Sequence, residues 1–334
     1  MSDALEALRV SESSPEQGED AFAEFAASAR SGSLQAQQKH LAGNALPEVL
    51  CGRYKLERLL GVGGMGAVYR CRDLLREQFG DPEPVVAVKV LSEDFCEYPD
   101  ANALLYSEFA LTARLRHAHI VRLHGFEVDN HSGRAFIVLD LLKGITLDQL
   151  LSSQQGLPWA QVQEIGQQLC QALSYAHEQG VLHGDIKPSN LMLGDDGITL
   201  FDFGLGQAEE KRLPGLPRLA RNRFAAWTPR YAAPELLDGG ELTVAADVYA
   251  LGCVLYELAS GQHPFRRLSA KQAVQTGLTL EPAVQWPEIS WPTLAQALEF
   301  DPLKRITLAE LLQSLRENPA ANSGWRTRWF GRRA

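Results

Sequence analysis

The spacing of apolar residues changes near residue 142, and this change limits the folds that the chain can adopt. From 53 to 142, apolar and polar residues alternate in short runs, which is typical of strands. From 143 onward, apolar residues recur every three or four positions, which is typical of helices that cover a core. The sequence therefore predicts an α+β fold with a small β-rich N-lobe, 53–142, and a larger helical C-lobe, 143–316.

The same pattern places individual elements. In the N-lobe, short apolar runs predict strands at 54–57, 67–69, 85–88 and 136–142. The polar stretch 73–84 predicts a long loop, and 101–115 predicts one helix within this lobe. In the C-lobe, the spacing predicts helices at 158–179, 245–260 and 293–316.

Both ends of the chain differ from this folded part. Residues 1–52 are rich in Ser and Ala and hold eight acidic residues against three basic ones, a net charge of −5. With only two aromatic residues, they predict a disordered acidic arm whose serines are candidates for autophosphorylation. Residues 317–334 form a basic aromatic tail with four Arg, two Trp and one Phe.

The overall composition excludes several classes of protein. A net charge of −9 argues against a protein that binds nucleic acid through its phosphates. The chain has no apolar run of about 18 residues and no basic, then apolar N-terminus, so we expect neither a membrane span nor a signal peptide. Five cysteines without a C-x-x-C pair predict free thiols in a reducing compartment, so a cytoplasmic location is expected.

A glycine-rich run lies between the first two predicted strands. Residues 60–69 read LGVGGMGAVY, and glycines at the first, third and sixth positions of G-x-G-x-x-G let a backbone approach phosphate oxygens closely. In dinucleotide sites this pattern opens a helix, whereas here it continues as a strand. Lys89 ends the apolar run Val-Ala-Val-Lys. This position argues against a Lys exposed on the surface and predicts one that binds the phosphates of a nucleotide.

A Lys that holds phosphates needs a carboxylate to orient it. Glu108 lies nineteen residues after Lys89 within the predicted helix of the N-lobe. An exposed helix Glu is the alternative interpretation. The position of Glu108 among apolar helix residues favours the partner of Lys89.

The stretch HGDIKPSN, 183–190, supplies a second set of polar residues. Asp185 is placed to accept a proton from an incoming hydroxyl, and Lys187 can neutralise charge on a transferring phosphoryl group. Asn190 and Asp202, of Asp-Phe-Gly, offer the oxygen ligands that Mg²⁺ prefers. His183 follows two apolar residues and is interpreted as a core residue that fixes the loop.

With Thr-Pro-x-Tyr-x-Ala-Pro-Glu at 228–235, six motifs now stand in order: the Gly-rich loop, Val-Ala-Val-Lys, the helix Glu, His-x-Asp-x-Lys-x-x-Asn, Asp-Phe-Gly and Ala-Pro-Glu. In this order the chain resembles the bacterial eukaryotic-like Ser/Thr protein kinases over about 53–316. The resemblance implies a bilobal protein-kinase-like fold, and it implies that the γ-phosphate of ATP is transferred to Ser or Thr of proteins.

The resemblance also implies roles for single residues. Asp247 would brace the catalytic loop, and Arg305 would pair with Glu235. The cofactors implied are ATP and Mg²⁺, with Mn²⁺ as an alternative. The catalytic residues implied are Asp185, Lys187, Lys89 and Glu108. The implied ATP-binding residues are Leu60, Gly61, Gly63, Gly64, Gly66, Val68, Ala87, Lys89, Asp140, Leu142, Asn190 and Asp202, of which Asn190 and Asp202 would hold the metal.

Gly184 departs from the pattern, because many members of the family carry Arg before the catalytic Asp. That Arg binds a phosphorylated residue of the activation segment. Here 205–227 contain no Ser, Thr or Tyr, so we expect a kinase that is not switched by activation-loop phosphorylation.

Two other functions stay open. His-Gly-Asp is frequent in aminoglycoside-type small-molecule phosphotransferases, although Lys187 and the 228–235 motif favour protein substrates. A nucleotide-binding pseudokinase scaffold is the third class. Expected partners are protein substrates, forkhead-associated phosphopeptide readers and a cognate protein phosphatase.

Overall fold

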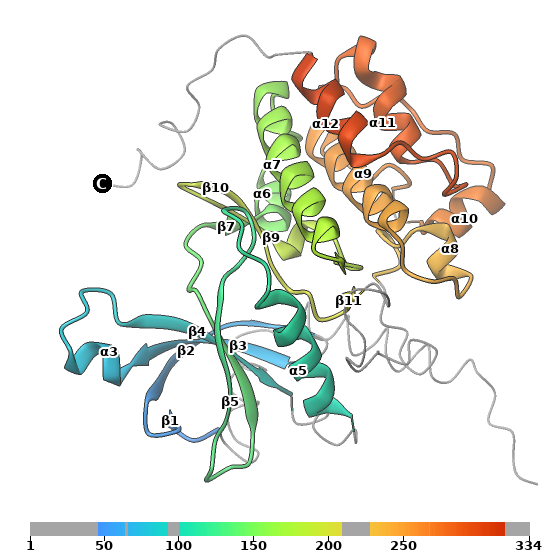
Figure 1. Ribbon diagram of the computed structural model, residues 1–334. Coiled ribbons are helices and arrows are strands. Elements are labelled where there is room, and N and C mark those ends of the chain that lie inside the picture. The colour runs from blue at the N-terminus through green and yellow to red at the C-terminus, as the bar shows by residue number, and fades with distance from the viewer. Residues whose placement is uncertain (1–45, 64–65, 93–99, 209–227, 267, 318–334) are drawn as a thin grey trace, which may run out of the picture.

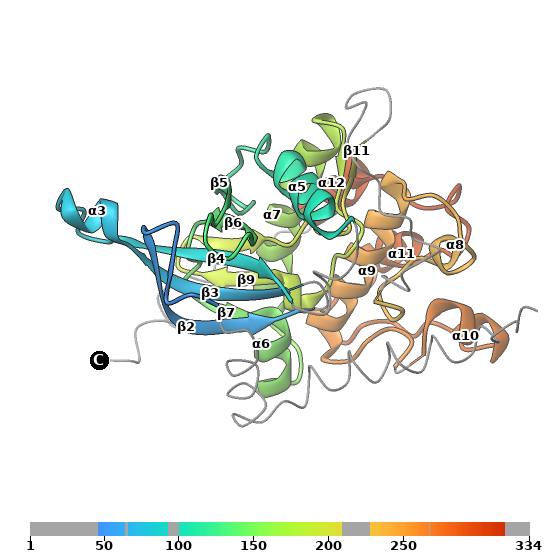
Figure 2. The ribbon, with the colours of Figure 1, turned by 90° about the horizontal axis from the view of Figure 1, so that it is seen from below.

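The structure is a computed structural model, and it describes residues 46–63, 66–92, 100–208, 228–266 and 268–317. Within these residues the chain forms two lobes. A curled sheet with the helices α3 and α5 lies on one side, and a bundle of helices lies on the other (Figures 1 and 2). The α+β fold of two lobes predicted from the sequence is confirmed.

The first lobe is built on a six-stranded antiparallel sheet with the strand order β1-β2-β3-β4-β6-β5. Alternating burial along β3 and continuous burial along β4 explain the apolar runs that predicted these strands. The strands are β1 (Val49–Leu50), β2 (Tyr54–Val62), β3 (Gly66–Asp73), β4 (Val85–Leu91), β5 (Leu123–Val128) and β6 (Ala135–Leu139).

The sequence predicts that the folded part starts at Arg53. In the structure the folded part begins earlier, with β1. Val49 in β1 pairs with Lys55 in β2, and Leu50 is fully buried in the core of the lobe. A short two-residue strand has too little periodicity to be recognised from sequence alone. Most of the predicted acidic arm, residues 1–45, lies outside the described residues.

Of the helices in the described residues, two belong to this lobe. The predicted helix is α5 (Ala101–Thr112), which packs on β4, β5 and β6. A second helix, α3 (Leu74–Gln78), corrects the prediction of a continuous loop over 73–84. Its cause is local, because the side chain of Asp73 accepts hydrogen bonds from the backbone N–H groups of Leu75 and Arg76 and so caps the helix.

The second lobe is mainly helical, with short strands near the first lobe. β7 (Ile145–Thr146), β9 (Leu191–Gly194) and β10 (Gly197–Leu200) form one small sheet, and β8 (Val181–Leu182) pairs with β11 (Gln207–Ala208). The helices are α6 (Leu147–Ser153), α7 (Trp159–Glu178), α8 (Pro234–Leu237), α9 (Val244–Ser260), α10 (Ala270–Gln275), α11 (Trp291–Ala297) and α12 (Leu308–Glu317). Two 3₁₀ turns cover Pro188–Asn190 and Glu288–Ser290.

The long helices α7 and α9 form the centre of this lobe and confirm the predicted helices at 158–179 and 245–260. α9 starts where the Thr243 side chain accepts a hydrogen bond from the Ala246 N–H, and it ends at Gly261, whose φ of 73° suits glycine. The helix predicted at 293–316 is instead divided into α11 and α12. None of the described helices combines the length and the apolar character needed to cross a bilayer.

Candidate active site

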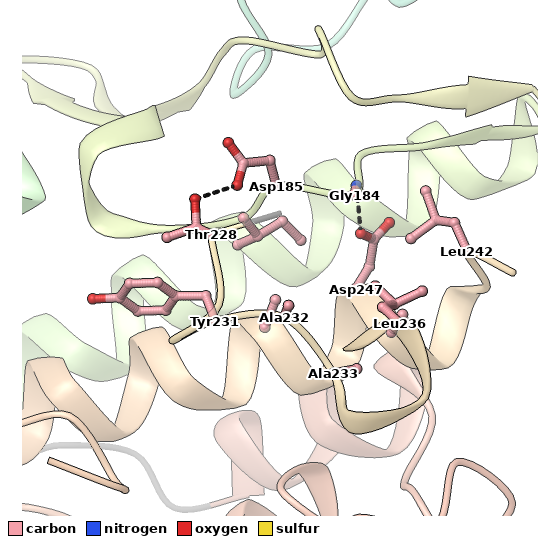
Figure 3. Close-up of a pocket in the computed structure, with 12 residues that line it drawn as sticks. Gly184, Asp185, Thr228, Tyr231, Ala232, Ala233, Leu236, Leu242 and Asp247 are labelled. Atoms are coloured by element: carbon pink, nitrogen blue, oxygen red, sulfur yellow. Dashed lines mark hydrogen bonds between the residues drawn. The ribbon is translucent and has the colours of Figure 1, made fainter. Parts of the chain in front are cut away.

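The loop between β8 and β9 holds Asp185 in a cluster of polar side chains. One carboxylate oxygen of Asp185, Oδ1, accepts a hydrogen bond of 2.8 Å from the Thr228 hydroxyl (Figure 3). The other, Oδ2, lies 2.5 Å from Lys187 Nζ and 3.1 Å from Asn190 Nδ2. Lys187 also donates to the Thr228 hydroxyl at 3.0 Å. The structure thus brings together three predicted site residues, and Thr228 completes the cluster.

Asp247 in the first turn of α9 braces this loop from below. Its carboxylate accepts hydrogen bonds of 2.9 Å from the backbone N–H groups of His183 and Gly184, and it lies 2.8 Å from His177 Nε2. Burial alone would raise the pKa of Asp247, but His177 and the donated hydrogen bonds lower it. The carboxylate is therefore ionised at neutral pH, and the predicted brace is confirmed.

His183 is fully buried and fixes the loop through both ring nitrogens. Its Nδ1 accepts a hydrogen bond from the Asp185 N–H at 3.1 Å, and its Nε2 lies 3.1 Å from the Phe201 carbonyl oxygen. Burial lowers the pKa of His183, so the ring is neutral, and an accepting Nδ1 places its one proton on Nε2. The prediction that His183 is a core residue is confirmed.

Gly184 has a structural role that the sequence interpretation missed. Its φ is 77°, in the left-handed region where a residue with a Cβ is strained. The hydrogen bond to Asp247 holds its N–H in this conformation. Glycine is therefore favoured here by the backbone itself, whatever the state of the activation segment.

A second cluster joins the two lobes. Lys89 Nζ, from β4, lies 2.7 Å from both carboxylate oxygens of Glu108, from α5, and 2.7 Å from Asp202 Oδ1, which follows β10. The Lys89 and Glu108 side chains are 11% and 9% exposed, whereas that of Asp202 is 39% exposed. The predicted pair is present, and Asp202 turns one side of its carboxylate to solvent.

Each charged group in this cluster shifts the pKa of its neighbours. Burial opposes the charge of Lys89, but the two carboxylates outweigh it and raise the pKa of this amine. For Asp202 burial also opposes the charge, and Lys89 reverses that effect and lowers the pKa to about 2. Asp202 is thus ionised at neutral pH. Its φ of 65° is unusual for a residue other than glycine, and such strain is typical of functional sites.

Asn190 and Asp202 offer oxygen ligands to a divalent cation. The backbone N–H of Phe201 donates to the Asn190 carbonyl oxygen at 3.1 Å, so the segments carrying the two side chains lie side by side. The Asn190 amide nitrogen is used by Asp185, which leaves the amide oxygen as its free ligand atom. An amide oxygen and a carboxylate form the kind of donor set that Mg²⁺ accepts.

The glycines of the glycine-rich loop occupy their positions for different structural reasons. A Cβ at Gly61 would meet no atom within 4 Å, so this position is open for a ligand. A Cβ at Gly66 would lie 2.2 Å from the Val90 carbonyl oxygen, so packing against β4 requires glycine there. The Gly63 N–H donates to the Gly66 carbonyl at 2.7 Å and closes the turn between β2 and β3. Gly64 lies outside the described residues.

The remaining predicted nucleotide residues lie on the same sheet and the linker after it. Leu60 is on β2 and 42% exposed, Val68 pairs with Lys89, and Ala87 is buried opposite Leu139. In the linker, the Asp140 carboxylate lies 2.6 Å from His124 Nε2, and the Asp140 N–H donates to the Arg122 carbonyl oxygen at 2.9 Å. Leu142 packs against the core of the first lobe.

The segment 228–235 forms a platform next to Asp185, supported by groups that the sequence did not predict. The Tyr231 hydroxyl donates to Glu257 at 2.5 Å, and the Tyr231 ring packs edge-on against buried His263. Arg305 donates to both carboxylate oxygens of Glu235, which confirms the predicted pair. Alanine and leucine make up half of the residues that line a small cavity between this platform, α9 and the catalytic loop (Figure 3).

The chain is similar to proteins of a known family. The protein kinase domain matches residues 54–315. The chain is 36% identical over 229 residues to the serine/threonine-protein kinase PknH of Mycobacterium tuberculosis, covering 68% of this chain and 34% of PknH. It is 35% identical over 245 residues to PknD of the same species, covering 72% and 35%, and 33% identical over 277 residues to PkaA of Streptomyces coelicolor, covering 79% and 49%.

The chain thus spans about a third to a half of the length of these relatives. All three are named as bacterial serine/threonine-protein kinases, and their family uses ATP and a divalent metal. With the domain match over most of its length and two carboxylate clusters where the family motifs predict them, the chain belongs to the protein kinase domain family.

Proposed function

We propose that this protein is a kinase that transfers the γ-phosphate of ATP to Ser and Thr hydroxyls of proteins. The observation that carries the proposal is the cluster of Asp185, Lys187 and Thr228. Its carboxylate is held in place by side chains from the loop and from the platform on which a peptide would lie. A small-molecule phosphotransferase has no need for such a platform.

The roles of the residues follow from this arrangement. Asp185 accepts the proton of the acceptor hydroxyl and orients its oxygen towards the phosphate. Lys187, 2.5 Å from that carboxylate, lies where it can offset negative charge on the phosphoryl group. Lys89, oriented by Glu108, holds the nucleotide phosphates. The open backbone at Gly61 and Gly63 admits them.

Asp202 and Asn190 would hold the divalent cation, and we infer Mg²⁺ from their oxygen ligands. When bound, Mg²⁺ neutralises charge on the phosphates. Asp202 can serve this function at neutral pH because its pKa of about 2 keeps it ionised. Lys89 Nζ takes only one of its two carboxylate oxygens.

Activity without phosphate on the activation segment is part of the proposal. The Lys89–Glu108 pair is formed, and the catalytic loop is held by Asp247 through the backbone of His183 and Gly184. Segment 205–227 contains no hydroxyl acceptor. Residues 209–227 lie outside the described residues, so the support comes from the loop and from the sequence.

The cellular setting is inferred from chemistry. The four described cysteines are free thiols, which supports a reducing compartment such as the cytoplasm. Phosphoserines on the acidic arm would offer sites to forkhead-associated readers, and a protein phosphatase would remove them.

The test is a transfer assay with ATP labelled on its γ-phosphate, Mg²⁺, a general acceptor protein and Asp185→Asn as the control. We expect label on Ser and Thr of the acceptor and of the chain itself, none within 205–227, and no label with the variant. Transfer only to small hydroxyl or amino compounds would identify a small-molecule phosphotransferase. Nucleotide binding without any transfer would identify a scaffold.

A further inference from the structure

Arg230 lies on the platform two residues after Thr228, whose hydroxyl binds Asp185. Its guanidinium Cζ lies 5.9 Å from the centre of the Tyr231 ring, and its Nη2 donates to the Arg266 carbonyl oxygen at 2.9 Å. The side chain is half-buried. A positive charge is therefore held on the platform whose Thr228 binds the Asp185 carboxylate.

The donors of Arg230 are largely unused. Its Nε is buried and has no hydrogen-bond partner among the described residues, and no described carboxylate forms an ion pair with it. Glu257 is the acid whose charge acts on Arg230, but Glu257 Oε2 accepts the Tyr231 hydroxyl. A guanidinium has five N–H donors, and leaving a buried donor unpaired costs about 1–3 kcal/mol.

Arg305, on the same lobe, shows what a structural arginine looks like here. It donates to both oxygens of Glu235 and to the carbonyl oxygens of Ala245, Glu299 and Phe300. Its side chain is fully buried. Arg230 has a single hydrogen bond by comparison. Its Nε is buried out of reach, so the donors left to a ligand are on the two Nη groups.

We propose that Arg230 is a specificity-determining residue that binds a carboxylate close to the acceptor residue, so that the kinase prefers acidic peptide segments. The exposed side chain of Arg266 adds a second positive charge next to it. Thr228 and Arg230 lie in one tight turn, in which the Tyr231 N–H donates to the Thr228 carbonyl oxygen at 2.9 Å, so Arg230 stays close to Thr228. In an extended peptide, an acid two or three residues from the acceptor lies about 7–11 Å from it, which suits a long side chain that starts at this turn. This inference rests on the proposed protein kinase activity.

One such segment belongs to this chain. Residues 11–20 read SESSPEQGED, with three serines, four acidic residues and no basic residue. Every one of these serines has an acid within three residues. The acidic arm is therefore a substrate of the kind that Arg230 selects, supplied by the same molecule or by a second copy.

The test uses the full chain and two synthetic peptides of residues 10–21. One has the natural sequence, and the other carries Glu12→Gln, Glu16→Gln, Glu19→Gln and Asp20→Asn. The enzymes are the unmodified protein, Arg230→Gln, Arg230→Glu and the control Arg316→Gln, an exposed arginine on α12. A third peptide, with Lys at the four acidic positions, tests the reversed charge.

We expect Arg230→Gln to raise KM for the acidic peptide about three- to tenfold, the range for a partly exposed charge pair, with kcat and the neutral peptide little changed. Arg230→Glu should prefer the Lys-containing peptide, which a purely structural role could not produce. Arg316→Gln should match the unmodified protein.

Equal loss for acidic and neutral peptides in Arg230→Gln, or no charge preference in the unmodified protein, would overturn this inference alone. Label on neither peptide nor on any acceptor protein would overturn the proposed kinase activity as well, and the two failures are thus distinguishable.

Discussion

The nucleotide half of the site is joined by ion pairs between residues 19 and 113 positions apart, from Lys89 to Glu108 and Asp202. In the acceptor half, by contrast, Asp185 contacts Lys187 and Asn190, two and five positions away, and Thr228, 43 positions away in the same lobe. The first cluster needs both lobes in place, because Lys89 and Glu108 belong to one lobe and Asp202 to the other. The second is completed within the helical lobe.

This difference shows how the fold separates binding from transfer. Asp247 and the 3₁₀ turn hold the acceptor half through contacts within the helical lobe. The nucleotide half depends on the position of α5, so any movement of that helix changes phosphate binding first. Substitutions in the acceptor half should therefore affect transfer alone, and substitutions in the nucleotide half should affect nucleotide use.

The strongest test of this separation is Asp185→Asn. We expect kcat to fall by about three orders of magnitude, within the range for loss of a general base, because the amide cannot take a proton from the acceptor. Nucleotide affinity, measured by calorimetry, should change far less than kcat, since Asp185 does not contact Lys89, Glu108 or Asp202 and touches the proposed metal ligands only through the Asn190 amide nitrogen. A parallel loss of nucleotide affinity would show that the halves are coupled.

Glu108→Gln tests the other half. It removes the charge that orients Lys89 and leaves Asp202 as the only carboxylate near this amine. A hydrogen bond between charged groups contributes about 1.5–3 kcal/mol, so kcat/KM for ATP should fall about ten- to hundredfold. KM for the acceptor should change little. The matched control is Glu241→Gln, an exposed carboxylate in the helical lobe, which should leave both constants as they are.

Acid should affect the two halves in different pH ranges. Burial lowers the pKa of His263, beneath the platform, from 6.5 to about 3, so the unfolded chain binds this proton and the folded chain does not. The stability from neutral His263 is present above pH 6.5 and is lost as the pH falls towards 3. The pKa of Asp202 is about 2, so the stability from its charge is present above about pH 4 and is lost as the pH falls towards 2.

His263→Asn isolates this effect, because the Asn side-chain oxygen can replace Nδ1 as acceptor for the Phe265 N–H. From pH 7 to pH 5 the unmodified protein should lose about 2 kcal/mol more of its free energy of unfolding than the variant. Urea titrations of both proteins at the two pH values measure this difference in the free energy of unfolding. Identical pH slopes for the two proteins would mean that His263 is protonated in the folded state.

Residues that lie within recognisable motifs were predictable, even where the fold brings them together from distant segments, and residues outside any motif were not. Lys89, Glu108 and Asp185 lie within recognisable motifs, and their contacts are found. Glu257 and His263 support Tyr231 from 26 and 32 positions further along the chain, with no pattern to mark them. Their roles appear only when α9 and the following loop fold under the platform.

The division of the helix predicted at 293–316 had a signal that could have been used. Thr307 and Glu310 form a capping box, in which the Thr307 hydroxyl receives the Glu310 N–H and the Glu310 carboxylate receives the Thr307 N–H. This pattern marks a helix start at Leu308. The turn before it is held by Arg305, whose bonds to the Glu299 and Phe300 carbonyls are invisible in sequence.

Gly184→Ala should have the smallest effect of these substitutions. From the sequence, this glycine is explained by the absence of a phosphorylated residue in the activation segment. At a φ of 77°, alanine should cost about 1 kcal/mol of stability, which lowers Tm by about 2–4 °C in a domain of this size. Because the strain falls on the N–H that binds Asp247, kcat should fall together with the stability, while ATP affinity stays unchanged.

The control is Gly239→Ala, where φ is 84° and no atom lies within 4 Å of the new Cβ. It should lose similar stability and keep full kcat, because its loop does not touch Asp185. Equal kcat in the two variants would mean that the backbone at Gly184 does not position the catalytic carboxylate, and the absence of loop phosphorylation would then be the better explanation of this glycine.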